Sequence, residues 1–265
     1  MSSRWTDLIH GLRCSLKFSN GAAIVGSRLF RRRARAVTYV WKSRVRLVCD
    51  TAQRDHIGVQ EIFAEDCYGP FLDACSFSGG RVSYVNVGAN IGAFDLWLRD
   101  RGLHIHQGLA VELNPLTCER CARKFQLNAL TGVKLVPCGV AGRDEVTNFH
   151  PGGHSLADSI LSRTRSAAGG VPVELVTLAT LLQRHDAGRG EFDLLKLDCE
   201  GAEYEILRES TVATLRRFRY IVAEFHPEPA GESVAAAYTR LGAAGFASRA
   251  GAPGVFRFTD LFVRA

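Results

Sequence analysis

The sequence contains no long hydrophobic run. Among its 265 residues, no apolar stretch reaches the roughly 18 residues that a membrane-spanning helix requires. The basic N-terminus also lacks an apolar segment of about 7–15 residues, the core of a secretory signal. The composition, with 46% hydrophobic and 23% charged residues, is that of an ordinary globular protein. We therefore expect a soluble, cytoplasmic protein with no membrane span.

A second pair of closely spaced cysteines is also missing. Cys118 and Cys121 form a single C-x-x-C, whereas a structural zinc site would need a second such pair. Both cysteines share one face of a helix predicted over residues 116–129 with Phe125, and buried cysteine packs as a small hydrophobe. We predict that these thiols belong to the core and that a reducing cytosol suits the eight cysteines of the chain.

Acidic residues are scarce at the N-terminal end. Residues 1–46 carry a net charge of +10, whereas the rest of the chain carries −4. A basic arm can bind nucleic acid, anionic lipid or an acidic protein. Aromatic residues are not interleaved with the basic ones in the way that a single-strand binding platform needs. We therefore favour a solvated extension and do not favour nucleic acid as a partner.

The predicted elements divide the chain into two parts. Residues 1–56 are expected to form a basic N-terminal extension, with one short helix near its start and one or two antiparallel strands over residues 37–49. Residues 57–265 are expected to form the main domain. It opens with a helical stretch over residues 57–77 that is broken at Gly69-Pro70.

The three-glycine fingerprint of dinucleotide-binding proteins is incomplete, but its strand–turn–helix setting is present. Residues 82–87 read as a buried strand, and helical periodicity begins at Ala93. Glycines in such a turn let a ligand approach the backbone, and the following helix offers free N–H groups. We therefore predict the floor of a nucleoside-cofactor site here. Its residues are Gly88, Ala89, Asn90 and Gly92.

Acidic residues stand at the ends of two further predicted strands. Glu112 lies twenty residues beyond Gly92, where an acid in a doubly wound fold accepts hydrogen bonds from ribose hydroxyls. Asp198 and Glu200 follow an apolar strand over residues 192–197. The carboxyl ends of parallel strands face one crevice, so we expect these acids at the same rim as the glycine turn.

His226 follows another apolar strand and is a candidate general base, because histidine titrates near neutrality. Asp198 and Glu200 are the other catalytic candidates, acting directly or through a divalent cation. Two carboxylates could suit Mg²⁺ but are few for a dedicated site. A divalent cation is therefore not favoured, and no residue is assigned to a metal. A polar stretch over residues 151–170 predicts a lid or binding loop.

Several blocks together are typical of one family. They are Asn86-Val87-Gly88-Ala89-Asn90-Ile91-Gly92, Glu112-Leu113-Asn114-Pro115, Leu195-Lys196-Leu197-Asp198-Cys199-Glu200-Gly201-Ala202-Glu203 and Val222-Ala223-Glu224-Phe225-His226. With these blocks, residues 58–226 resemble the FkbM-type methyltransferases that depend on S-adenosylmethionine (SAM).

The resemblance implies an α/β fold of the Rossmann-like, class I methyltransferase type. Its seven-stranded sheet would be mostly parallel, with an antiparallel last strand pair. It also implies methyl transfer from SAM, usually to a hydroxyl of a sugar, glycan or secondary metabolite. By position, the glycine turn would surround the methionine end of SAM, Glu112 would hold the ribose, and residues near Cys138-Gly139 would flank adenine. Asn86 and Asp198 complete the predicted cofactor-binding set.

Three positions depart from the usual pattern of that family. Asn86 stands in place of Asp, Leu113 in place of Pro, and Ala179 in place of Asp. A catalytically degenerate binding or scaffold protein therefore stays open as an alternative. A nicotinamide-dependent oxidoreductase would use Glu112 in the same way, but the missing third glycine argues against it. The expected partner is a small-molecule or carbohydrate acceptor, and the sequence predicts neither its identity nor the oligomeric state.

Overall fold

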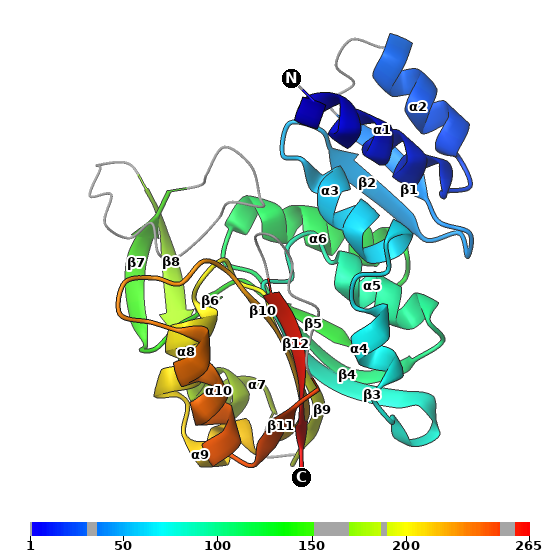
Figure 1. The fold of residues 1–265 in the computed structure, drawn as a ribbon. Coiled ribbons are helices and arrows are strands. Elements are labelled where there is room, and N and C mark those ends of the chain that lie inside the picture. Colours follow the sequence, from blue (N-terminus) through cyan, green and yellow to red (C-terminus); the bar gives the residue numbers. More distant parts are fainter. Residues whose placement is uncertain (1, 31–35, 151–169, 187–189, 250–257) are drawn as a thin grey trace.

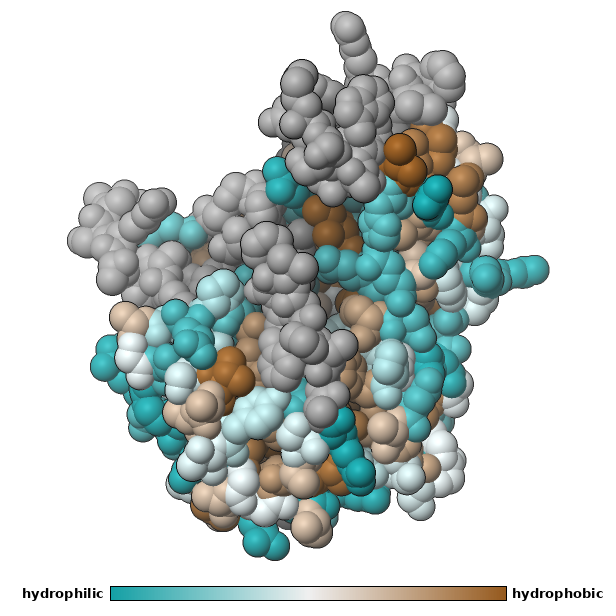
Figure 2. Space-filling view, viewed as in Figure 1, coloured by the Kyte–Doolittle hydropathy of each residue, from teal (hydrophilic) through white to brown (hydrophobic). Residues whose placement is uncertain are grey.

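The computed structural model describes residues 2–30, 36–150, 170–186, 190–249 and 258–265 (Figure 1). The predicted loop at 151–170 lies outside these residues except for its last position. Among the described residues, no helix combines the length and the hydrophobicity that crossing a bilayer requires. Hydrophilic and weakly polar residues cover most of the face drawn in Figure 2, and strongly hydrophobic ones appear there in small groups.

The centre of the molecule is a seven-stranded sheet of order β11-β12-β10-β9-β3-β4-β5. Pairs from β10 through β5 are parallel, whereas β12 runs antiparallel to both β10 and β11. This topology confirms the predicted Rossmann-like sheet with its antiparallel last pair. The strands are β3 (Arg81–Val87), β4 (His104–Val111), β5 (Val133–Val136), β9 (Phe192–Leu197), β10 (Phe218–Phe225), β11 (Phe246–Ser248) and β12 (Phe258–Arg264).

Helices cover both faces of this sheet (Figure 1). Neighbouring residues such as Leu194 and Leu195 point into two separate buried clusters, because side chains alternate along a strand. Both faces of the central strands are therefore apolar, as in other parallel sheets. The helices are α5 (Ala93–Asp100) and α6 (Pro115–Leu127) on one face, and α7 (Leu178–Asp186), α8 (Glu203–Glu209), α9 (Val212–Leu215) and α10 (Val234–Ala243) on the other.

A small second sheet stands beside the first, with the order β6-β8-β7. Its strands are β6 (Gly139–Val140), β7 (Glu145–Phe149) and β8 (Val171–Val176). Residues 133–140 do not form one continuous strand, because β5 ends at Val136 and β6 pairs with β8. Pro137 separates the two, since it has no N–H to donate to a ladder. The chain therefore changes sheets directly beside the cofactor site.

The N-terminal part is more ordered than the sequence indicated. It contains α1 (Ser2–Leu16), α2 (Gly21–Phe30) and an antiparallel hairpin of β1 (Ala36–Val40) and β2 (Arg46–Asp50). The hairpin was predicted, and α2 was missed. Phe18, Tyr39 and Leu47 share one buried cluster with residues of the main sheet. The division at residue 56 falls inside the helix α3 (Asp55–Val59) and stays a prediction.

The helical stretch after β2 is broken earlier than predicted. A π-helical turn η1 (Gln60–Ala64) continues α3. The helix α4 (Gly69–Asp73) begins at the Gly-Pro pair where the break was predicted. Proline is tolerated at the first turn of a helix, where its missing N–H has no partner to lose. A short 3₁₀ turn η2 (Ser78–Gly80) then leads into β3. Glu61 and Ile62 of η1 line the cavity at the carboxyl ends of the strands.

Candidate functional site

A cavity of ≈ 990 Å³, its open mouth included, lies at the carboxyl ends of β3, β4 and β9. In an open α/β sheet this rim is the expected ligand crevice. Most of the predicted site residues line it. They are Gly88, Ala89, Asn90, Glu112, Cys138, Gly139, Asp198 and Glu200. The lining does not include Asn86, Gly92 or His226.

Gly88 joins three strands at the floor of the cavity. Its φ of +79° lies in the left-handed region, and a Cβ here would stand 1.8 Å from the carbonyl oxygen of Asp198. The backbone N–H groups of Gly88 and Ala89 donate to the Val111 carbonyl, at 3.0 and 2.9 Å. Only glycine fits where β3, β4 and β9 converge.

Gly92 serves packing instead of the cavity. It caps the start of α5 with a φ of +77°, and a Cβ would lie 2.4 Å from a ring carbon of Phe125 and 2.8 Å from the Cys121 sulfur. Both contacts belong to the α6 face, where Cys118 and Cys121 are buried as predicted. Gly92 therefore allows α5 and α6 to approach each other behind the loop.

Glu112 ties the loop to the end of β4. Its carboxylate accepts from the backbone N–H of Asn90 at 2.8 Å and from that of Asn114 at 2.9 Å. Asn90 has a φ of +49°, and its buried Oδ1 has no hydrogen-bond partner among the described residues. A cavity with a fixed carboxylate and an unused amide acceptor at its wall fits the hydroxyl and amino groups of a nucleoside.

The part of the lining around Gly139 is apolar. Leu113, Cys138 and Val140 line the cavity around Gly139, where a Cβ would lie 2.5 Å from a Leu175 methyl and 2.9 Å from a Leu113 methyl. Such a wall can pack against a flat base. The residues present thus fit a nucleoside cofactor at both its ribose and its base.

Asn86 lies behind the loop and is fully buried. Its amide donates to Asp95 at 3.0 Å, and the Tyr84 hydroxyl donates to the same carboxylate at 2.7 Å. Burial raises the pKa of Asp95 to about 6, although these two hydrogen bonds act in the opposite direction. A second carboxylate at position 86 would stand against Asp95, so the amide found here avoids a buried repulsion between like charges.

A cluster of acids occupies the rim beside Gly88. The Tyr68 hydroxyl lies 3.0 Å from both Asp198 Oδ2 and Glu224 Oε2. Lys196 is 1% exposed, and its ammonium lies 3.0 Å from Asp198 Oδ2 and 3.4 Å from the Gly88 carbonyl oxygen. The same ammonium stands over the ring of Tyr68 at 5.5 Å. This buried cation pairs with Asp198 at the rim.

Three of these side chains were missing from the predicted site set. Along the sequence, Tyr68 lies 130 residues from Asp198 and 156 residues from Glu224. No local pattern reports such a meeting. Lys196 carried a usable signal, because a charged residue inside the apolar run of β9 is rarely buried without a partner.

His226 belongs to the same cluster and is 7% exposed. Its Nδ1 lies 3.0 Å from Glu203 Oε1, and its Nε2 lies 3.4 Å from Glu200 Oε2 and 3.8 Å from Asp198 Oδ1. Burial alone would lower the pKa of His226, but the hydrogen bond to Glu203 and the three carboxylate charges outweigh it and raise the pKa to about 9. The imidazole is therefore protonated at neutral pH.

The protonated histidine also bears on metal binding. Asp198, Glu224 and His226 each bring one ligand atom within 4.8 Å of the others. A metal ligand must be the neutral imidazole, so a cation here would have to displace a firmly held proton. Lys196 adds a second positive charge within the group. The expectation that a divalent cation is not favoured stays a prediction.

Replacing His226 with Gln should remove a pH dependence of stability. The pKa of His226 rises from 6.5 to about 9 on folding, so its stabilisation is complete below about pH 6.5 and is lost as pH rises through about 9. We expect the wild-type free energy of unfolding, measured with urea, to fall by on the order of 3 kcal/mol across this window relative to the variant. Parallel curves for both proteins would contradict the charged state. The exposed His104, changed to Gln, is the control.

The site can be compared with known proteins at the level of sequence. The Methyltransferase FkbM domain family matches residues 86–247. Methyltransferase sdnD of Sordaria araneosa is 32% identical over 207 residues, which cover 65% of this chain and 74% of that protein. Methyltransferase 1 of Beauveria bassiana is 31% identical over 169 residues, 56% of this chain and 64% of that protein. Residues 86–247, which the family model matches, contain the glycine loop, Glu112 and the acidic cluster from Asp198 onward.

Solved structures show weaker likenesses. Methyltransferase FkbM from Methylobacillus flagellatus KT has a TM-score of 0.49 at 10% identity, covering 81% of this chain and 55% of that one. Magnesium protoporphyrin IX methyltransferase from Synechocystis PCC 6803, solved with bound SAM, has a TM-score of 0.47 at 12% identity, covering 82% and 85%.

Proposed function

Because this chain belongs to the FkbM family of methyltransferases, whose methyl donor is SAM, we propose that it methylates a hydroxyl oxygen of a sugar, glycan or secondary metabolite. The observation that carries the choice of acceptor atom is the acidic rim. Asp198 and Glu200 line the cavity next to the glycine loop, and a hydroxyl acceptor needs a group that takes its proton.

The cavity residues have separate roles in this proposal. Bound SAM supplies an electrophilic methyl group on a sulfonium. The loop from Gly88 to Asn90 holds the methionine end, Glu112 accepts from the ribose hydroxyls, and the wall around Gly139 packs against adenine. The chain contributes mainly proximity and alignment for an in-line displacement. The carboxylates of the rim also place negative charge near the positive sulfonium.

The proton of the acceptor passes to the carboxylates. His226 was a candidate base, but it is protonated at neutral pH and does not line the cavity. We assign it as a positioning residue, which holds Glu200 and Asp198 through its Nε2. Asp198 and Glu200 then face the acceptor as the groups that orient and deprotonate its hydroxyl.

The scaffold alternative loses its main support in the structure. Asn86 and Ala179 were the departures that most supported that alternative. The Asn86 side chain donates to Asp95, Ala179 is an exposed residue of α7, and neither lines the cavity. Both changes therefore leave the charge of the cavity lining as it is. An enzymatic function is the better supported of the two.

Calorimetric titration tests the cofactor site first. We expect the purified chain to bind SAM and S-adenosylhomocysteine at micromolar concentrations and not to bind NAD. Replacing Glu112 with Ala should weaken SAM binding about 10–100-fold, since it removes a ribose acceptor and loosens the loop. The exposed Glu119 on α6, changed to Ala, is the matched control. Unchanged SAM affinity in the Glu112 variant would contradict the assignment.

The acceptor class is tested with labelled SAM and a panel of hydroxylated sugars and metabolites. Products are located by mass and by NMR of the new methyl group. An O-methyl product whose formation is lost in Glu200→Gln, with SAM binding retained, would support the proposal. Methylation only at nitrogen, sulfur or carbon would contradict it.

A further inference from the structure

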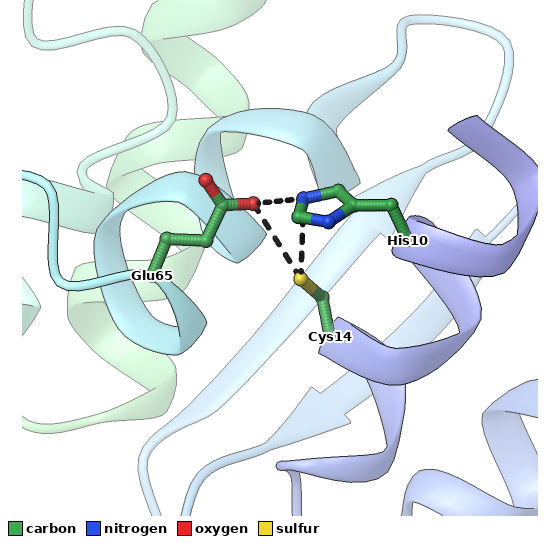
Figure 3. A group of neighbouring side chains, drawn as sticks. All are labelled: His10, Cys14 and Glu65. Atoms are coloured by element: carbon green, nitrogen blue, oxygen red, sulfur yellow. Dashed lines mark hydrogen bonds and ion pairs between the residues drawn. The ribbon is translucent and has the colours of Figure 1, made fainter. Parts of the chain in front are cut away.

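A second group of side chains with metal-binding chemistry lies outside the cofactor site. His10 and Cys14 come from α1, and Glu65 follows the turn η1 (Figure 3). The two residues on α1 are four apart, so they share one face of the helix. All three side chains point toward one another in Figure 3. The group is one of two among the described residues that could hold a metal ion in this way.

The distances within this group suit a tetrahedral ion. Cys14 Sγ lies 3.6 Å from His10 Nε2 and 3.5 Å from Glu65 Oε1. Zinc–ligand bond lengths put the edges of a tetrahedral site at about 3.3–3.6 Å. The third edge, from His10 Nε2 to Glu65 Oε1, is 2.7 Å. It would open by about 0.6 Å to reach that geometry, and the side chain of His10 is 62% exposed and free to move.

Other contacts hold α1 in place without an ion. Gln60 donates from its amide to the Gly11 carbonyl at 3.0 Å and to the Ser15 hydroxyl at 2.9 Å. Lys17 donates to the Ala64 carbonyl at 2.6 Å. The backbones that carry the three ligand atoms are therefore fixed independently, which lowers the ordering cost of binding a metal.

We propose that His10, Cys14 and Glu65 bind a zinc ion, with water as the fourth ligand, and that the ion fastens α1 to the turn η1. Nitrogen, sulfur and oxygen together suit zinc, whereas Mg²⁺ and Ca²⁺ prefer oxygen alone. A thiolate and a carboxylate also balance the charge of a divalent ion. This zinc site lies close to the cofactor cavity, because Glu61 and Ile62 of η1 line that cavity.

The Cys14 thiol donates to the Glu65 carboxylate at 3.5 Å when no ion is bound. Zinc binding breaks the S–H bond, forms a sulfur–zinc bond and releases the proton to solvent. Uptake of zinc should therefore acidify a weakly buffered solution.

Cobalt titration of the full chain tests the site directly. We expect one Co²⁺ per chain, with a thiolate-to-cobalt charge-transfer band that Zn²⁺ abolishes by competition. Cys14→Ser should lose the band, and His10→Ala and Glu65→Gln should each weaken binding at least about 100-fold. A double variant of Cys75→Ser and His106→Ala, which lie outside the group, should bind like the wild type.

Two outcomes would overturn the proposal. One is a wild-type chain that binds neither ion, and the other is a charge-transfer band that persists in Cys14→Ser. If Cys14→Ser fails to fold, the exposed His10→Ala decides, since its loss of binding is read on a folded chain by circular dichroism. Amide hydrogen exchange tests whether the ion fastens α1 to η1. Zinc should slow amide exchange in residues 60–64 of the wild type but not in the His10→Ala variant. None of these readouts depends on SAM or on an acceptor.

Discussion

Replacing Gly88 with Ala is expected to abolish SAM binding and to destabilise the chain by about 2–5 kcal/mol. The left-handed conformation alone costs about 1–2 kcal/mol for a residue with a side chain. The new methyl group would also meet the backbone oxygen of Asp198 at 1.8 Å. Backbone cannot rotate away as a side chain can, so β9 must move from β3, which adds strain of about 1–3 kcal/mol and displaces the acidic rim.

Gly80 offers a matched control for that variant. Its φ is +66°, but a Cβ there would have no atom within 4 Å. Gly80→Ala should therefore show only the conformational cost of about 1–2 kcal/mol and bind SAM normally. Urea unfolding and calorimetry measure both quantities. Equal losses of stability in the two variants would show that the contact with Asp198 is not what requires glycine at position 88.

Replacing Lys196 with Met is expected to destabilise the chain by about 3–5 kcal/mol, the usual cost of leaving one partner of a buried ion pair alone. Lys196 is 1% exposed and pairs with Asp198 at 3.0 Å. Its removal leaves Asp198 and Glu224 sharing the Tyr68 hydroxyl without the ammonium, and the protonated His226 remains 3.8 Å from Asp198 Oδ1. The loss should shrink at acid pH, where protonated carboxyl groups no longer repel each other.

A double-mutant cycle isolates the pair. Adding Asp198→Asn to Lys196→Met should recover part of the lost stability, because it removes the uncompensated charge. Lys134 on β5 is exposed and, changed to Met, should alter the free energy of unfolding by less than about 0.5 kcal/mol. Strictly additive losses in the double variant would mean that Lys196 acts through packing and not through its charge.

The two variants report on different parts of the site. Gly88 allows β3, β4 and β9 to approach one another at the floor of the cavity. Lys196 compensates negative charge at the acidic rim beside it. A chain that keeps Gly88 but lacks Lys196 would keep the fold and lose the order of the acidic rim. The glycine loop and the acidic rim are therefore separable by measurement.

The sequence by itself determined the sheet and the floor of the cavity. Short apolar runs marked the central strands, and the glycine turn and the acids Glu112 and Asp198 stand directly at strand ends. Such features are local, because a few neighbouring residues set the turn and the strand before it. The parallel order then brings the strand ends to one rim without further information.

Tertiary structure alone decided which side chains meet across the sheet. Tyr68 reaches Asp198 and Glu224 from the turn before α4, and Asn86 pairs with Asp95 behind the loop. His10 and Glu65 lie 55 residues apart in the sequence and 2.7 Å apart in space. These contacts depend on the register of neighbouring strands and on how helices pack over them. Packing depends on the shape of the whole core, which no local pattern in the sequence contains.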